Sequence, residues 1–203
     1  MKSRCQSPSL LLGTRNAGKL REIETILGNV PWPIRSLHEF KSVDVASEPG
    51  DTYAENAILK AQFYARETRL CALADDSGLE VEALGGGPGV YSARYAGANA
   101  SDADRRRLLL SELAQVPAEF RGARFVCVVA IAMPEGTVLN VSEGMCNGRI
   151  AFEPRGEGGF GYDPLFVPAG FNETFAELAD SIKNQISHRA RALLKAKEFL
   201  TRG

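Results

Sequence analysis

Two adjacent carboxylates, Asp75 and Asp76, follow the apolar run 71–74, and Ser77 and Gly78 come directly after them. Neighbouring side chains of an extended chain point to opposite faces, so we expect the two acids to do different jobs. Carboxylates backed by glycine at the end of a strand can hold Mg²⁺ or activate a water molecule. The alternative is a solvated turn, which the same residue types favour. This segment alone favours the turn, whereas the other segments of the chain favour the chemistry.

A second segment, residues 13–20, nearly matches the phosphate-binding pattern G-x-x-x-x-G-K-[ST]. Leu20 stands where that pattern has a Mg²⁺-ligating hydroxyl. A strand before the segment and a helix after it would still aim free backbone N–H groups at a phosphate, and Lys19 adds a positive charge. We therefore predict a phosphate site whose metal ligands come from elsewhere in the chain. An ordinary strand-to-helix turn with a surface lysine is the alternative.

Two carboxylates are candidates for the missing metal ligands, because Mg²⁺ usually takes one or two carboxylates together with waters and substrate phosphates. One is Asp76, and the other is Glu48, which opens the predicted turn 48–51. Lys60, at the edge of the helix predicted after that turn, is a second candidate phosphate contact. Without the neighbouring segments, Glu48 would be an exposed turn acid and Lys60 a solvated lysine.

Two later segments carry groups that suit a nucleobase. In the glycine-rich segment 158–164, Phe160 could stack on a base and Asp163 could accept a hydrogen bond from a base or sugar. Lys183 and the segment 187–189 (Ser-His-Arg) offer hydrogen-bond donors, which suit a ligand with carbonyl oxygens. The alternatives are a phenylalanine in the core and a plain serine N-cap with its neighbours in water.

The elements that must position these groups alternate between strand and helix early in the chain and end with a long hairpin. This order predicts a mixed α/β domain with a cleft between two lobes. We expect strands at 9–13, 34–37, 71–75, 125–133 and 137–145, and helices at 18–27, 52–69, 101–113 and 187–199.

The composition is that of an ordinary globular protein. The 203 residues suffice for one large domain or two small lobes, and 44% of them are hydrophobic and 24% charged. A net charge of −1 argues against a uniformly basic surface, so we expect no nucleic-acid or membrane partner. No stretch approaches the ~20 apolar residues of a membrane span. The leucines at 10–12 are too few for the apolar region of a signal peptide.

The four cysteines, Cys5, Cys71, Cys127 and Cys146, form no C-x-x-C pair and have no histidine at ligand spacing. We therefore expect neither a zinc site nor a disulfide framework. Cys71 and Cys127 lie in apolar runs and are expected to be small buried hydrophobes. A reducing, cytoplasmic setting fits this pattern best.

Six blocks, in this order, resemble the inosine triphosphate pyrophosphatase family. They are Thr14–Lys19, Glu55–Lys60, Asp75–Gly78, Tyr91–Tyr95, Phe160–Asp163 and Ser187–Arg189. Each block is weak alone, but their joint order and spacing are specific, and the similarity runs from about residue 9 to about residue 200. The resemblance implies hydrolysis of non-standard purine nucleoside triphosphates (dITP, ITP and XTP) to the monophosphate and pyrophosphate, which cleanses the nucleotide pool.

The resemblance also implies a Mg²⁺ cofactor, bound by Glu48 and Asp76, with Asp76 as the proton acceptor for the attacking water. It further implies a homodimer with an elongated, mixed α/β fold, in which residues 1–203 form a single domain of two lobes with the substrate cleft between them. The expected substrate contacts are Thr14, Arg15, Asn16, Ala17, Gly18, Lys19, Lys60, Ser77, Phe160, Gly161, Tyr162, Asp163, Lys183, His188 and Arg189.

These roles lead to a hypothesis for the reaction. Water attacks the α-phosphorus, and Lys19 and Lys60 offset the charge on the departing pyrophosphate. Donors from His188 and Arg189 pair with the six-oxygen of inosine or xanthosine, whereas the six-amino group of adenosine would face another donor.

Three other functions are open at this point. A related pyrophosphatase of the same general fold could act on other bases, such as modified pyrimidines. A nucleotide-binding regulatory module would have no turnover, although binding alone rarely needs two carboxylates. A P-loop ATPase is disfavoured by Leu20.

Overall fold

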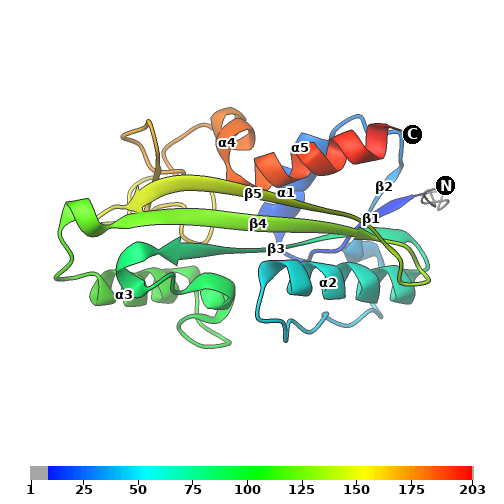
Figure 1. Ribbon diagram of the computed structural model, residues 1–203, viewed down its shortest axis with the longest axis horizontal. Helices are drawn as coiled ribbons and strands as arrows, with labels where there is room; N and C mark the ends of the chain where they lie inside the picture. The colour runs from blue at the N-terminus through cyan, green and yellow to red at the C-terminus, as the bar shows by residue number, and fades with distance from the viewer. Residues whose placement is uncertain (1–8, 203) are drawn as a thin grey trace. The chain divides into compact units, whose positions relative to one another are not determined.

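The computed structural model describes residues 9–202, and within them six strands form one mixed sheet in the order β2-β1-β3-β4-β5-β6 (Figure 1). Strand β1 pairs in parallel with both β2 and β3, and β5 pairs antiparallel with β6. The strands are β1 (Leu10–Leu12), β2 (Ile34–Ser36), β3 (Cys71–Val81), β4 (Gly122–Ala132), β5 (Val138–Ile150) and β6 (Phe166–Pro168). The predicted mixed α/β fold is therefore confirmed.

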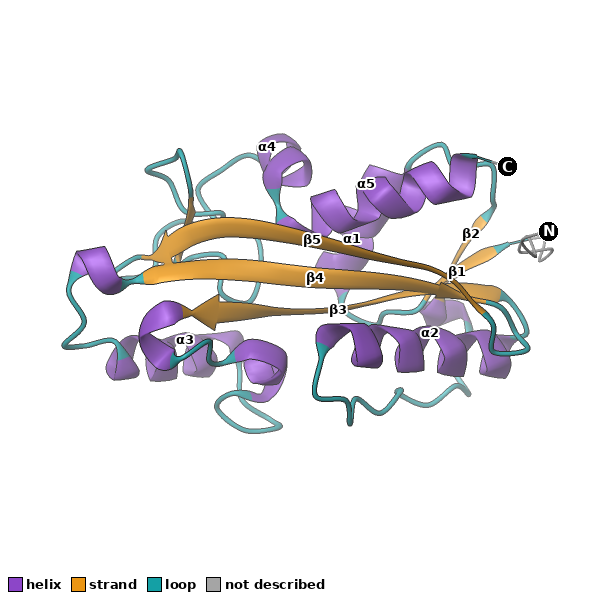
Figure 2. Cartoon of the chain, in the orientation of Figure 1, coloured by secondary structure: helices purple, strands orange, loops and turns teal. Residues whose placement is uncertain are grey.

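Helices flank this sheet (Figure 2). The α-helices are α1 (Ala17–Leu27), α2 (Tyr53–Thr68), α3 (Asp102–Glu112), α4 (Asp180–Ile186) and α5 (His188–Thr201). Four short 3₁₀ turns connect the elements of the described chain: Leu37–Glu39, Glu82–Leu84, Gly89–Arg94 and Ala118–Phe120.

The described chain divides into two compact units. Unit 1 consists of residues 9–76, 127–144 and 189–202, and unit 2 consists of residues 77–126 and 145–188. Strands β3, β4 and β5 each contribute residues to both units. The cleft between two lobes and the single-domain organisation stay predictions.

The core of unit 1 explains why its strands read as unbroken apolar runs. All three residues of β1 are fully buried, which is typical of a parallel strand covered on both faces. Leu10 and Leu12 belong to the cluster that includes Ile23 of α1 and Leu193 of α5. Within this unit, α1 and α5 lie on one side of the strands and α2 on the other (Figure 1).

Local sequence signals set the ends of the helices in unit 1. Thr52 and Glu55 form the predicted capping box at the start of α2, which satisfies backbone N–H groups that would otherwise lack partners. Asn16 caps α1 in the same way, because its side-chain oxygen accepts from the backbone N–H of Lys19 at 3.0 Å.

Unit 2 has an aromatic core. The ring of Phe125 lies 4.7 Å from that of Phe166 and 6.1 Å from that of Phe175. Leu109 of α3 belongs to the same buried cluster. Ser101, as predicted, caps α3 through a capping box with Asp104.

The sequence prediction missed several boundaries. Strand β3 was expected to end at Asp75 but continues to Val81, so Asp75 and Asp76 lie inside a buried strand and the solvated-turn alternative is wrong. Neither β6 nor α4 was predicted. Both are short, and neither shows a clear apolar periodicity.

Cys71 is disulfide-bonded, which its spacing did not predict, whereas Cys127 and Cys146 are free and buried. Residues 1–8, which include Cys5 and for which no signal peptide was predicted, lie outside the described residues. Among residues 9–202, no helix combines the length and the apolar character that a membrane span requires.

The close approach of α2 to the end of β1 generates a prediction. A Cβ at Gly13 would lie 2.7 Å from the ring of Tyr64, so this position accommodates only glycine without movement. We expect Gly13→Ala to lower the free energy of unfolding by about 1–3 kcal/mol, the usual range for overpacking. Urea unfolding measures this, and Gly13→Ala combined with Tyr64→Leu should recover part of the loss. An unchanged midpoint in the single variant would contradict the contact.

Candidate functional site

Asp75 and Asp76 are both buried, with exposed fractions of 1% and 6%, and as neighbours in β3 they point to opposite faces of the strand. Burial of an ionised carboxylate is costly unless charges or donors compensate it. Different groups compensate the burial of the two carboxylates, and this difference organises the charged groups of unit 1.

Asp75 is the centre of a network of cations. Its Oδ2 atom lies 3.0 Å from Lys19 Nζ and 3.4 Å from Arg189 Nε. Burial alone would raise the pKa of this carboxyl, but the charges of Lys19 and Arg189 hold it well below its ordinary value. Asp75 is therefore a fixed anion and a poor proton acceptor. Its other oxygen, Oδ1, is buried without a hydrogen-bond partner among the described residues.

Arg189 forms ion pairs with two carboxylates. Its side chain is 2% exposed, and Nη1 lies 2.5 Å from Glu22 Oε2 while Nε faces Asp75. Burial would lower the pKa of the guanidinium, but Glu22 and Asp75 raise it. The structure thus gives Arg189 partners in unit 1 that the sequence did not predict, and its contact with a base stays a prediction.

Asp76 receives a neutral donor instead. Its Oδ2 accepts a hydrogen bond from Asn56 Nδ2 at 3.1 Å. Burial raises the pKa of this carboxyl, Lys60 and Lys19 pull it down, and the nearby charge of Glu48 adds to the rise, so the net shift is upward. The pKa values of the two acids therefore shift in opposite directions, as their different predicted jobs require.

Lys60 is buried, with 9% of the residue exposed, so the alternative of a solvated lysine is wrong. Its Nζ lies 2.5 Å from Glu48 Oε1. Burial alone would lower the pKa of the ammonium, but Asp75 and Glu48 outweigh it and keep the pKa raised. Lys60 is thus a permanent cation among three carboxylates.

The phosphate-binding candidates lie around the start of α1. Thr14 is buried, and its Oγ1 accepts from the N–H of Asn16 at 3.2 Å. Ala17 and Gly18 form the first turn of the helix. An ammonium has three donors, so the pairing of Lys19 with Asp75 leaves capacity for a phosphate oxygen.

Two neighbours of this segment have structural partners. Arg15 donates from Nη2 to the carbonyl of Val43 at 2.5 Å, which ties the segment to the chain after β2. Leu20 packs against the buried cluster of unit 1, which explains why an apolar residue replaces the hydroxyl of the P-loop pattern.

The residues of unit 1 fit a Mg²⁺ ion. Glu48 and Asp76 supply the hard oxygen ligands that this ion prefers. Their mutual repulsion is visible in the raised pKa of Asp76, and a divalent cation would relieve it. Within residues 9–202, no group of three or more His, Cys, Asp or Glu side chains is arranged to hold a metal. Mg²⁺ does not need one, because waters and phosphates complete its coordination.

A second buried ion pair organises the candidates in unit 2. Lys183 Nζ lies 2.5 Å from Asp163 Oδ2, and both side chains are at most 4% exposed. The same oxygen accepts from the N–H of Phe160 at 2.8 Å. Lys183 Nζ also lies 4.8 Å from the centre of the Phe160 ring. Gly159 has a φ of +69°, and a Cβ there would collide with the Asp163 carboxylate, so the turn requires glycine.

His188 belongs to the aromatic core of unit 2. It is 3% exposed, and its ring stacks on that of Phe125 at 4.5 Å. The alternative that placed His188 in water is therefore excluded. Tyr162 is also buried and donates from its hydroxyl to the carbonyl of Ser92 at 3.0 Å, which is a structural contact.

The remaining candidates in unit 2 are backbone or partly exposed positions. Gly161 donates its N–H to Asp102 Oδ2 at 2.8 Å, and its carbonyl accepts from Arg106 Nη1 at 2.6 Å. Ser77 is half-buried in β3. Sequence reasoning overlooked Glu22, Asn56, Asp102 and Arg106. For Asn56 the signal was available, because it lies four residues before Lys60, on the same helical face.

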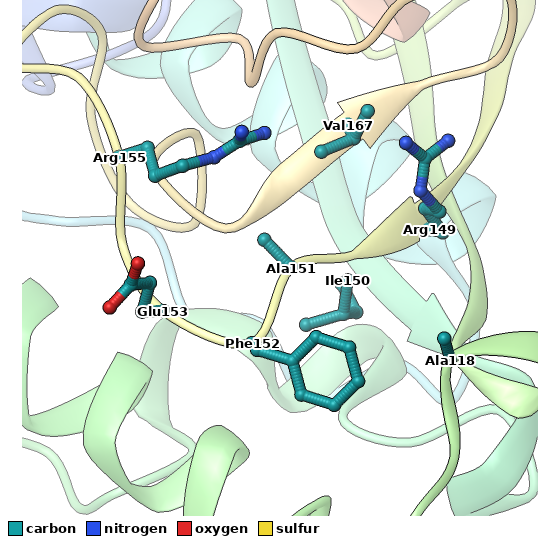
Figure 3. Close-up of a pocket in the computed structure, with 8 residues that line it drawn as sticks. All are labelled: Ala118, Arg149, Ile150, Ala151, Phe152, Glu153, Arg155 and Val167. Atoms are coloured by element: carbon teal, nitrogen blue, oxygen red, sulfur yellow. The ribbon is translucent and has the colours of Figure 1, made fainter.

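A separate pocket of about 270 Å³ lies in unit 2 (Figure 3). Its walls include the guanidinium groups of Arg149 and Arg155 and the ring of Phe152. None of the residues predicted for substrate or metal lines this pocket, so we do not assign it to the candidate site.

The fold and these clusters define a mixed α/β protein with charged groups suited to an anionic ligand. The chain belongs to the Ham1 family, whose model matches residues 10–199. The family resemblance inferred from the six sequence blocks is confirmed.

Relatives in this family carry a functional name. The chain is 50% identical over 193 residues to a dITP/XTP pyrophosphatase of Desulforamulus reducens, covering 95% of this chain and 96% of the relative. It is 51% identical over 191 residues to a dITP/XTP pyrophosphatase of Geobacter sulfurreducens, covering 94% and 96%. A solved Ham1 protein from Coxiella burnetii superposes with a TM-score of 0.87 at 42% identity, covering 96% of this chain and 99% of that one.

The buried network around Asp75 predicts a stability effect. Asp75→Asn keeps the shape but removes the anion that faces Lys19 and one of the two that face Arg189, and breaking a buried pair in this way costs about 3–5 kcal/mol. Chemical denaturation measures the loss. The control is Glu80→Gln, which breaks the exposed pair with Arg124 and should cost at most about 1 kcal/mol. Equal losses in the two variants would contradict the network.

Proposed function

We propose that this chain is a Mg²⁺-dependent pyrophosphatase that hydrolyses dITP, ITP and XTP to the nucleoside monophosphate and pyrophosphate. The observation that carries the proposal is the identity of about 50%, over nearly the whole chain, to relatives named dITP/XTP pyrophosphatase. The cluster of buried Asp76, buried Lys60 and half-buried Glu48 supplies chemistry that fits this reaction.

In unit 1, the residues at the start of α1 bind the triphosphate. The N–H groups of the first helical turn and the ammonium of Lys19 attract phosphate oxygens. Lys60 places a second buried cation beside Glu48, and both lysines offset negative charge as pyrophosphate leaves. Asp75 orients Lys19 through their ion pair.

Asp76 orients the attacking water and accepts its proton. Its raised pKa makes it a stronger base than an exposed aspartate, and Asn56 fixes the carboxylate without neutralising it. Glu48 and Asp76 would hold Mg²⁺, which would supply positive charge against the phosphates and lower the pKa of the attacking water.

In unit 2, Phe160, Asp163 and Lys183 recognise the base. The ion pair between Asp163 and Lys183 fixes the turn that presents Phe160, whose ring is suited to stacking. His188 is held rigidly by Phe125 and offers a ring N–H to a carbonyl oxygen at the six-position of the purine. Adenine presents an amino group there and would leave a buried donor unpaired.

The proposal extends to the setting of the enzyme. We propose a cytoplasmic homodimer without nucleic-acid or membrane partners, which agrees with a net charge of −1.

A substrate panel tests the proposed activity on the purified chain. Pyrophosphate release should be fastest with dITP, ITP or XTP and should stop when EDTA removes the divalent cation. An unpaired donor costs about 1–3 kcal/mol, which corresponds to roughly 5- to 150-fold slower turnover of ATP at limiting substrate. Equal rates for dITP and ATP would refute the donor model, and a preference for dUTP would support a pyrimidine-specific relative.

The role of Asp76 is tested by Asp76→Asn. We expect kcat for dITP to fall by about 10²- to 10⁴-fold, because the base is lost, whereas the nucleotide still binds. Stopped assays of pyrophosphate and fluorescence titration with a labelled nucleotide measure the two quantities. The control is Asp44→Asn, an exposed acid of unit 1. Normal turnover in Asp76→Asn would remove this residue from the mechanism.

A further inference from the structure

We propose that Asn56 is a positioning residue that holds Glu48 and Asp76 in the arrangement needed for the divalent cation. The inference rests on the proposed function, because that function requires the cation. It concerns a side chain that the proposed mechanism assigns to neither the substrate nor the metal.

All the polar atoms of the Asn56 side chain have partners. The residue is fully buried and lies in the first turns of α2. Its Nδ2 donates to Asp76 Oδ2 at 3.1 Å and to the carbonyl of Gly50 at 3.2 Å. Its Oδ1 accepts from the N–H of Gly50 at 2.8 Å. An amide has two N–H donors, so both are used. One side chain therefore joins strand β3 to the loop before α2.

That loop carries Glu48. Gly50 lies two residues after Glu48, and Asn56 holds both its N–H and its carbonyl, which fixes the path of the backbone. Glu55 adds to this by accepting from the N–H groups of Asp51 and Thr52. A Cβ at Gly50 would lie 2.8 Å from Asn56 Oδ1, so the loop packs directly on the amide.

The chemistry of an amide suits this position. A lysine or arginine at this position would neutralise Asp76 and compete with a cation. A carboxylate at this position would repel the carboxylate of Asp76. The neutral N–H of Asn56 orients the Oδ2 atom and leaves the charge of the carboxylate in place. Residues that orient metal ligands in this way typically change metal affinity or activity by about 10- to 100-fold when they are replaced.

The test compares four variants with the wild type. Asn56→Ala removes all three hydrogen bonds, and Asn56→Asp keeps the shape but turns a donor into an acceptor facing Asp76 and the Gly50 carbonyl. Gly50→Ala disturbs the same contact from the loop side without replacing a residue of α2, and its Cβ would also lie 2.8 Å from Glu55 Cβ. The matched control is Gln62→Ala, which removes another amide-to-carbonyl hydrogen bond of α2, to Gly136 at 2.7 Å.

The readout is Mn²⁺ binding in the presence of pyrophosphate, measured from the free-ion signal in electron paramagnetic resonance, on chains shown to be folded by circular dichroism. We expect Mn²⁺ affinity to fall by about 10- to 100-fold in Asn56→Ala, more in Asn56→Asp, and measurably in Gly50→Ala. Gln62→Ala should match the wild type. Raising Mg²⁺ should restore dITP turnover in Asn56→Ala, whereas the loss in Asp76→Asn should persist.

Unchanged Mn²⁺ affinity in Asn56→Ala overturns the inference, whether or not the melting temperature falls. Asn56 would then have only a structural role. If both Asn56 variants fail to fold, Gly50→Ala decides, and wild-type affinity in that variant overturns the inference. If the wild type neither binds Mn²⁺ nor releases pyrophosphate from dITP, the proposed function fails, and this inference fails with it.

Discussion

The arrangement of unit 1 follows from one constraint, which is the burial of two consecutive carboxylates inside a strand. Asp75 and Asp76 cannot stay ionised in β3 without compensation, and they face opposite sides of it. Asp75 is compensated by full charges from Lys19 and Arg189, which come from the start of α1 and the start of α5. These ion pairs fix the two helix starts around the strand, so the folding of this unit and the placement of the groups that we propose for phosphate binding have the same cause.

Asp76 is compensated differently, and the difference separates a structural anion from the carboxylate that we propose as the reactive one. The neutral amide of Asn56 donates a hydrogen bond to it, and burial together with Glu48 raises its pKa. Unit 2 also pairs a buried carboxylate with a full positive charge, because the buried pair of Lys183 and Asp163 supports the turn that carries Phe160. In both units a fully paired charge holds a loop or helix start, and the groups assigned to substrate lie beside it.

Much of this was predictable from local patterns. Apolar runs and capping residues gave the long helices and most of the strands, because Thr52 with Glu55 and Ser101 with Asp104 are direct signals of a helix start. The expected site residues came from the order and spacing of the six sequence blocks taken together. The partners of Arg189 and the burial of Lys60 were not predictable, because contacts such as Arg189 to Glu22, 167 residues apart, depend on tertiary packing. The full length of β3 was missed because Asp, Ser and Gly favour turns unless burial overrides them.

The central claim is that the two neighbouring acids are divided, Asp75 for the protein's own cations and Asp76 for a metal. The most direct measurement is an anomalous difference map from crystals of the wild type grown with Mn²⁺ and pyrophosphate. The account predicts a peak within ligand distance of Asp76 and Glu48, with Lys19 and Arg189 still on Asp75. A peak coordinated by Asp75 with Asp76 uninvolved would contradict it.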